Sequence, residues 1–354
     1  MDFYINGLNN LVSEKESHMT GVFEIADNFV STVAKHNPLS ATHMGIRGSD
    51  HMMPDYSPDS AHSFYRETAK ALKEMEAAVP LNNRERMCKG TFVDALSVSV
   101  EQFESHDYLR DINVLFSPVQ SIRSIFDLMP KDSVEAWENI ASRMEKVKDS
   151  LSTYQDALDK GRAEGLVSSR RQVNGCADQC AVWAGNRNSP PFFDSMVDAF
   201  DTCEISDGLL GIRLEKASKS ASKAYAEFGS YLRDAYLTDA TPFDGVGRER
   251  YALSAKGYLG MNIDPEETYD WGWEQLEWAR SEMLKTASAI SPGASIDEAI
   301  EILDSDPERM IKGEDEFRQW MQDLQNRTIE QMDGVHFDIL EPVREIEALI
   351  SPPG

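Results

Sequence analysis

The stretch RLEKASKSASKAYAEFGSYLRDAY, residues 213–236, decides the fold class. Its apolar side chains recur at every third or fourth position, which is the repeat of one face of an α-helix. A β-strand would instead alternate apolar and polar residues. The pattern therefore predicts a long helix with one buried face. That face consists of Ala217, Ala221, Ala224, Phe228 and Tyr231.

Similar repeats lie on both sides of this stretch, and strand patterns are almost absent. We predict an all-α, mostly helical, elongated body of roughly ten to twelve helices with few or no strands. FDIL at 337–340 could form a short extended piece. One further apolar face, over about 84–107, consists of Phe92, Leu96, Val100 and Phe103, and one after residue 264 consists of Tyr269, Trp273, Leu276, Ala279 and Met283. Helix-start signals occur at Ser57-Pro58 and Asp264-Pro265, and capping-box spacings at Asp132–Glu135 and Ser295–Glu298.

The sequence predicts an N-terminal tail at residues 1–20 and a single helical domain at residues 21–354. No Gly/Ser-rich or Pro-rich linker and no fixed internal repeat divides the chain. The last stretch, EPVREIEALISPPG at 341–354, runs from an apolar-periodic segment straight into Pro-Pro-Gly. Such turn residues normally stand between two elements. We therefore expect the domain to be incomplete at its C-terminus.

The composition is acidic and limits the partners. The 354 residues carry a formal net charge of −26, with 41% hydrophobic and 27% charged residues. A strongly negative chain repels phosphate backbones and anionic lipid surfaces, so we expect neither nucleic-acid nor membrane binding. Four cysteines are too few for a disulfide scaffold in a chain of this length, and the start has no apolar signal segment. We expect a cytoplasmic protein with reduced thiols.

Two groups of residues invite a metal hypothesis. Histidines occur four times within residues 36–62, but none of the spacings places two on one helical face, and prolines and glycines interrupt the segment. We interpret them as scattered histidines of a mainly loop segment. Cys176 and Cys180 have i, i+4 spacing, which could hold a metal or a regulatory thiol pair, but no second pair with zinc-site spacing accompanies them. We interpret these two as buried helix residues, and we assign no catalytic and no metal-binding residue.

Two segments supply candidates for a ligand cleft. Arg248, Arg250 and Tyr251, in GVGRERY at 245–251, could reach an anionic group because arginine pairs bidentately with carboxylates. Internal salt bridges are the alternative. In YDWGWEQLEW at 269–278, Trp271 and Trp273 fall on different faces of the expected helix. Such a helix is either buried on two sides or lines a cleft on one.

Five long stretches together resemble a bacterial family catalogued as domain of unknown function 885. The stretches are NPLSATHMGIRGSDHMMPDYSP at 37–58, RDINVLFSPVQSIRSIFDLMP at 110–130, SSRRQVNGCADQCAVWAG at 168–185, VGRERYALSAKGYLGMNIDPEETYDWGWEQLE at 246–277 and DGVHFDILEPVREIEALISPPG at 333–354. The resemblance covers the chain from about residue 20 to its end. It implies a mostly helical protein similar to gluzincin-type zinc metallopeptidases.

The chain lacks the metal-binding motif that is typical of that family. The family carries a His-Glu-Ala-Tyr-Pro-Gly-His-His-like motif beyond the Ser-Pro-Pro-Gly region, whereas no histidine of this chain is followed by glutamate. The resemblance therefore implies the N-terminal helical portion of a zinc-dependent peptidase or amide hydrolase acting on small peptides, inactive without a missing C-terminal half that would bring the zinc. Arg248, Arg250 and Tyr251, with Trp271 and Trp273 as apolar walls, would line its cleft.

Three origins of such a chain remain open. We expect a truncated portion of a larger architecture, and the alternatives are one half of a split enzyme and a metal-free helical binding or interaction module. Whether the chain is itself an enzyme is left undecided by the sequence. A fold that lacks its partner half would also expose an apolar seam, through which it could dimerise.

Overall fold

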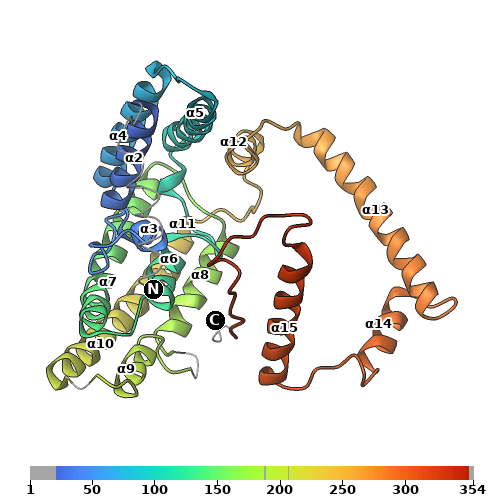
Figure 1. Ribbon diagram of the computed structural model, residues 1–354. Helices are drawn as coiled ribbons and strands as arrows, with labels where there is room; N and C mark the ends of the chain where they lie inside the picture. The colour runs from blue at the N-terminus through green and yellow to red at the C-terminus, as the bar shows by residue number, and fades with distance from the viewer. Residues whose placement is uncertain (1–20, 187–188, 206, 351–354) are drawn as a thin grey trace. The chain divides into compact units, whose positions relative to one another are not determined.

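The computed structural model describes residues 21–186, 189–205 and 207–350, which form helices joined by short loops (Figure 1). Within these ranges there is no strand, and isolated bridges join Ser169 to Thr241 and Asp333 to Phe337. The all-α prediction is therefore confirmed. The predicted tail at residues 1–20 lies outside the described residues. Among the described helices, none is long and apolar enough to cross a membrane.

The described residues group into two compact units, residues 21–263 and residues 264–350. Two such units can belong to one domain, so the single domain expected at 21–354 stays a prediction. The larger unit contains α2 (Gly21–His36), α3 (Pro38–His43), α4 (Pro58–Ala77), α5 (Asn83–Glu104), the 3-10 turn η1 (Asp107–Leu109), α6 (Pro118–Leu128), α7 (Val134–Ala163), α8 (Arg170–Trp183), α9 (Asp194–Asp201), α10 (Gly208–Tyr231), the π-turn η2 (Leu232–Tyr236), α11 (Leu237–Asp239) and α12 (Arg248–Leu259). The smaller unit contains α13 (Pro265–Ile290), α14 (Ile296–Asp304) and α15 (Glu314–Met332).

The core of the larger unit forms where α10 packs against α7, α8 and α9. The apolar face predicted for residues 213–236 is buried from Ala217 to Phe228, as expected. Beyond Tyr231 the α-helix gives way to the π-turn, which the sequence pattern did not indicate. Tyr236 in that turn is fully buried, and its hydroxyl accepts a hydrogen bond from the amide of Ser168 at 3.0 Å.

Most of the helix starts predicted from the sequence are confirmed. Ser57 caps α4 by accepting from the amide of Ser60, and Asp264 caps α13 with Pro265 in the first turn. Ser295 forms a full capping box with Glu298 at the start of α14. The cap of α7 is Ser133, one residue later than the Asp132 of the predicted spacing.

Candidate functional site

The larger unit contains a pocket of about 350 Å³ among α2, α3, α4 and the loops near residues 54–56 and 108–118. Ligand pockets in proteins usually measure about 300–1,000 Å³, so this pocket suits a small group better than a folded protein. Apolar and aromatic side chains form most of its wall. The titratable side chains that line it are His36, Asp55, Tyr56, Tyr108, Asp111 and Tyr154.

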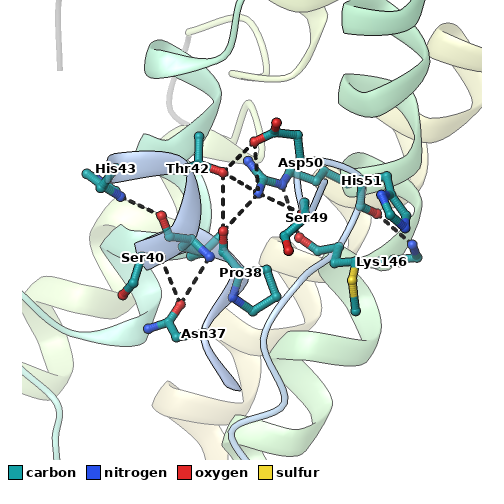
Figure 2. Close-up of polar contacts among 12 residues, drawn as sticks. Asn37, Pro38, Ser40, Thr42, His43, Ser49, Asp50, His51 and Lys146 are labelled. Carbon is teal, nitrogen blue, oxygen red and sulfur yellow. Dashed lines mark hydrogen bonds and ion pairs between the residues drawn. The ribbon is translucent and has the colours of Figure 1, made fainter. Parts of the chain in front are cut away.

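One wall is a loop, residues 44–56, that Arg143 of α7 holds by its main chain. The Arg143 side chain is fully buried, and its Nε donates to the carbonyl of Met52 at 3.0 Å. Its Nη2 donates to Thr42 Oγ1 at 2.7 Å and to the carbonyls of Pro38 and Ser49 at 3.2 and 3.3 Å. Figure 2 draws the contacts at Pro38, Thr42 and Ser49, which belong to α3 and to the loop, as dashed lines. One side chain thus fixes four points of the chain.

Burial lowers the pKa of Arg143 to about 10, against the opposing effect of Asp50, whose Oδ1 lies 3.9 Å from Nη2. The guanidinium is therefore still charged at neutral pH. Hydrogen bonds to a charged donor are stronger than those between neutral groups. Charge-assisted bonds from Arg143 therefore hold the loop, in addition to the apolar contacts of Met53 and Tyr56 with the core.

Three more residues of α7 continue this attachment on the same face of the helix. Lys146 donates to the carbonyl of His51 at 2.6 Å, and Ser150 donates to the carbonyl of Pro54 at 2.7 Å. The Oγ1 of Thr153 accepts the amide hydrogen of Tyr56 at 3.0 Å. Each of these bonds reaches the loop main chain, so α7 sets the path of the loop and places Tyr56 against the pocket.

The opposite wall is the loop that follows η1, and its main chain is held in the same manner. The hydroxyl of Tyr154 donates to the carbonyl of Asp111, and that of Ser168 donates to the carbonyl of Ile112 at 2.8 Å. Gly161 lets α7 approach η1 closely, because a Cβ there would lie 2.1 Å from the carbonyl oxygen of Leu109. Both pocket walls therefore rest on α7.

The Asp111 carboxyl group is the most perturbed acid of this pocket. Burial raises its pKa to about 6 and the charge of Asp107 adds to this, whereas a hydrogen bond from Asn113 and the charge of Arg250 oppose it. Asn113 Nδ2 lies 3.2 Å from Asp111 Oδ1. Within the described ranges, no cationic side chain lies within ion-pair distance of Asp111. By contrast Asp107, four residues earlier, pairs with Arg110 at 2.8 Å and with Arg250 at 2.9 Å.

The charge of Asp111 also acts on the phenols beside it. Burial is the larger cause of the raised pKa of Tyr56, and the Asp111 charge adds to it. The same two causes, in the same order, raise the pKa of Tyr154 well above its usual range. Both phenols therefore stay protonated at neutral pH and can donate a hydrogen bond but not act as bases.

The predicted cleft residues of α12 have different environments. Arg250 is partly buried and pairs with Asp107, next to the loop that carries Asp111. Arg248 and Tyr251 are exposed, Tyr251 at 47% of its surface, and neither lines the pocket described above. Arg250 thus acts on the pocket through charge, which agrees with the internal salt bridge considered as the alternative.

Trp271 and Trp273 lie on α13, in the other compact unit. They are 58% and 52% exposed, and Ala287 is the one buried residue of that helix. Trp273 packs edge-on against Tyr269 with ring centroids 6.1 Å apart. Within its own unit the helix thus leaves both tryptophans exposed, and a role of the two tryptophans as cleft walls stays a prediction.

The segment 36–62 is mainly loop, as interpreted from the sequence, because residues 44–57 lie outside helices, but three of its four histidines lie in helices. His36 ends α2, His43 ends α3 and His62 lies in α4. The cap Asn37 with Pro38 in the first turn, which starts α3, is the signal that the sequence reasoning missed. Over the described part of the chain, no group of three or more His, Cys, Asp or Glu side chains could hold a metal ion. His43 instead contacts the Leu39 carbonyl at 2.8 Å (Figure 2).

Cys176 and Cys180 are fully buried on α8, as interpreted from the sequence. Burial raises the pKa of Cys176 to about 11 and that of Cys180 still further. The Sγ of Cys176 donates to the carbonyl of Asn113 at 3.2 Å, which helps to hold the Asp111 loop. Their role is thus packing and support of the pocket wall.

Sequence reasoning did not single out Asp111, Tyr56, Tyr108 or Tyr154. A lone aspartate among 61 acidic residues carries no motif, and the three tyrosines come from distant segments. The available signal is indirect: Tyr56 lies in the stretch at 37–58 and Asp111 in the stretch at 110–130, two of those that carry the family resemblance.

Comparisons with solved structures agree on the fold. The "putative lipoprotein" of Colwellia psychrerythraea superimposes with a TM-score of 0.70 at 13% identity, covering 89% of this chain and 59% of that one. A "putative lipoprotein of unknown function" from Shewanella oneidensis gives a TM-score of 0.63 at 15% identity, covering 94% and 62%. The chain thus spans about three-fifths of the length of these structures. At such identities the likeness concerns the fold alone.

No curated protein matches the chain. Residues 38–354 match the family described as "Bacterial protein of unknown function (DUF885)". The match begins at Pro38, the first residue of α3, and includes the loop, α7 and the Asp111 segment that build the pocket.

Proposed function

The chain belongs to the bacterial DUF885 family, and from this premise we propose that it forms the substrate-binding part of a hydrolase for peptide or other amide bonds in small substrates. The observation that carries the proposal is the pocket at Asp111. It combines aromatic walls, a carboxyl group without a cationic partner within the described ranges, and two loops held rigidly on α7. Apolar walls with a few convergent polar groups are typical of small-molecule sites.

The zinc that the resemblance implies does not fit the residues of this chain. Over the described ranges no three metal-binding side chains lie together, and no histidine in the whole sequence is followed by glutamate. A catalytic zinc site needs three protein ligands and an open position. We therefore propose that this chain binds the substrate and that hydrolysis depends on groups supplied by another polypeptide segment.

Calorimetric titration of the purified chain with a library of short peptides tests the binding role. The Ala61→Trp variant, on the part of α4 that lines the pocket, should abolish binding because the indole occupies the cavity. Ala77→Trp, at the exposed end of the same helix, is the matched control and should bind as the wild type does. Equal binding by both variants, or no binding by the wild type, would refute the proposed site.

Activity is tested separately on the same peptides, with and without added zinc. The chain alone should bind them without cleavage, and metal analysis after dialysis should find no stoichiometric zinc. Chelator-sensitive turnover by the chain alone would contradict the proposal that another polypeptide segment supplies the groups for hydrolysis. If the chain binds peptides but no hydrolysis occurs even when zinc and the missing C-terminal half are supplied, the alternative of a metal-free binding module is favoured.

A further inference from the structure

Building on the proposed function, we propose that the Asp111 pocket takes a primary ammonium group, with the Asp111 carboxylate as its ionic partner and tyrosine rings as its walls. The substrate class is thus a small amine-bearing molecule. Its ammonium group belongs either to the free N-terminus of a peptide or to a lysine side chain. The remaining substituent would lie on the apolar part of the wall, formed by Val33, Ala61 and Phe64.

The first argument is that two neighbouring carboxylates differ in their ion pairs. Asp107 is neutralised by two arginines, Arg110 and Arg250. Asp111, which is partly buried and lines the cavity, receives one neutral hydrogen bond from Asn113 and no ion pair from the described residues. An ionised group that is withdrawn from water without a partner is costly. A cation arriving in the pocket would remove this cost, so the site favours a positively charged ligand.

The second argument is the chemistry of the walls. The rings of Tyr56 and Tyr154 meet edge-on with centroids 5.9 Å apart, and Tyr108 is stacked on Phe103 with centroids 4.9 Å apart. These rings are therefore fixed in position beside the carboxylate. Aromatic faces attract ammonium groups through their quadrupole, and the attraction grows when water is excluded. Anionic ligands would meet the charges of Asp111 and Asp55 and are disfavoured.

The third argument concerns pH. Because Asp111 must be ionised to pair with a cation, binding should weaken as the pH falls through the raised pKa of about 6. His36 also lines the pocket, so it has to be tested as a second source of pH dependence. The titratable and charged groups that act on Asp111 or line its pocket are His36, Asp55, Tyr56, Asp107, Tyr108, Tyr154, Cys176 and Arg250.

The test is calorimetric titration of the full chain with three matched probes at pH 7.5. Leucine amide carries a free α-ammonium group, N-acetyl-leucine amide lacks it, and Nα-acetyl-lysine amide carries the ammonium on its side chain. We expect at least one of the two ammonium probes to bind about ten- to a hundredfold more tightly than N-acetyl-leucine amide. The stronger of the two ammonium probes identifies the source of the group.

Three variants assign the effect to Asp111. Asp111→Asn should remove the preference for the ammonium probe and the pH dependence between pH 5 and 7.5. Asp59→Asn removes an exposed acid of α4 that does not line the pocket, and it should leave the preference within about twofold, which controls for the negative charge of the whole chain. His36→Gln should keep the pH dependence.

The outcomes separate this inference from the proposed function. If short peptides bind in the pocket but acetylated and free probes bind equally, or if Asp59→Asn weakens ammonium binding as much as Asp111→Asn, the ammonium site is refuted while the proposed function stands. If Ala61→Trp leaves all peptide binding unchanged, the proposed function fails, and this inference fails with it.

Discussion

The hydroxyl of Tyr154 donates a hydrogen bond to the main-chain carbonyl of Asp111, 43 residues earlier in the sequence. The ring of the same tyrosine packs against Tyr56, which belongs to the opposite wall of the pocket. Tyr154 itself is 2% exposed and is part of the core between α7 and α10. Tyr154 therefore connects the core to both walls of the pocket. A small change at Tyr154 should shift these walls and so change ligand affinity.

Replacing Tyr154 with phenylalanine removes one oxygen and preserves the ring. We expect the free energy of unfolding to fall by about 1–2 kcal/mol, since the Asp111 carbonyl loses its buried donor. Peptide affinity should fall as well because the Asp111 loop is released. Urea unfolding followed by tryptophan fluorescence measures the first effect, and calorimetric titration the second. Tyr258→Phe, at a residue 93% exposed, is the control, and an equal loss in both variants would contradict the argument.

Arg143→Met should destabilise the fold and free the loop at residues 44–56. The substitution keeps much of the buried stem but leaves the carbonyls of Met52, Pro38 and Ser49 without their charged donor. A loss on the order of 2–4 kcal/mol is expected. The specific readout is hydrogen exchange at the Tyr56 amide, which should accelerate more than exchange in α10.

Arg47→Met on the same loop is the matched control for this experiment, because Arg47 is exposed. It should change stability by no more than about 0.5 kcal/mol. Unchanged exchange at Tyr56 in the Arg143→Met variant would show that the loop holds its position without the guanidinium.

Asp111→Asn should stabilise the protein at neutral pH, which is unusual for a change at a partly buried residue. The folded chain raises the pKa of Asp111 from 3.8 to about 6. The folded state therefore binds this proton more tightly than the unfolded state, and the resulting stability is present below pH 4 and is lost as the pH rises through 6. Asparagine cannot ionise, so it should raise the unfolding free energy by on the order of 1–3 kcal/mol at pH 7.5.

Thermal melts of wild type and Asp111→Asn at pH 4 and pH 7.5 measure this difference. The gain should appear at pH 7.5 and vanish at pH 4. Asp55→Asn is the control, and its exposed side chain should give no such gain. A variant that is less stable than wild type at pH 7.5 would mean that Asp111 is a structural acid, and it would weaken the assignment of a ligand site.

The sequence predicted the fold class well because helix caps and apolar faces are local signals. Ser57, Asp264 and Ser295 act as caps through their immediate neighbours, and the α10 face repeats within one helix. The pocket could not be predicted in this manner. Its walls meet because α7 binds two loops that lie about 40 to 100 residues away, mostly through main-chain carbonyls. Carbonyls are present at every residue, so no sequence pattern marks them.

The buried cysteines Cys176 and Cys180 should be labelled by thiol reagents more slowly than the half-buried Cys203. The thiolate is the reactive form of cysteine, and burial raises the pKa of Cys176 to about 11 and that of Cys180 further. We expect both to resist a disulfide reagent at pH 8 in the folded protein and to react once urea unfolds it. Mass spectrometry of the labelled peptides identifies the sites. Cys203, which is half-buried, is the internal comparison. Fast labelling of Cys180 under native conditions would mean that α8 opens readily.

The exposed aromatic side chains of α13 should bind hydrophobic dyes and promote self-association. Trp271 and Trp278 are 58% and 63% exposed, and Val343 and Leu349 in the last described segment are 53% and 74% exposed. Exposed apolar surface of this kind is typical of interaction sites. Trp271→Ser combined with Trp278→Ser should lower dye fluorescence and shift sedimentation towards the monomer, while the melting temperature changes little because neither ring is buried. Ser281→Ala on the same helix is the control. A wild-type chain that is monomeric at all concentrations and binds no dye would contradict the predicted seam, and a large fall in melting temperature would show that these tryptophans are packed in solution.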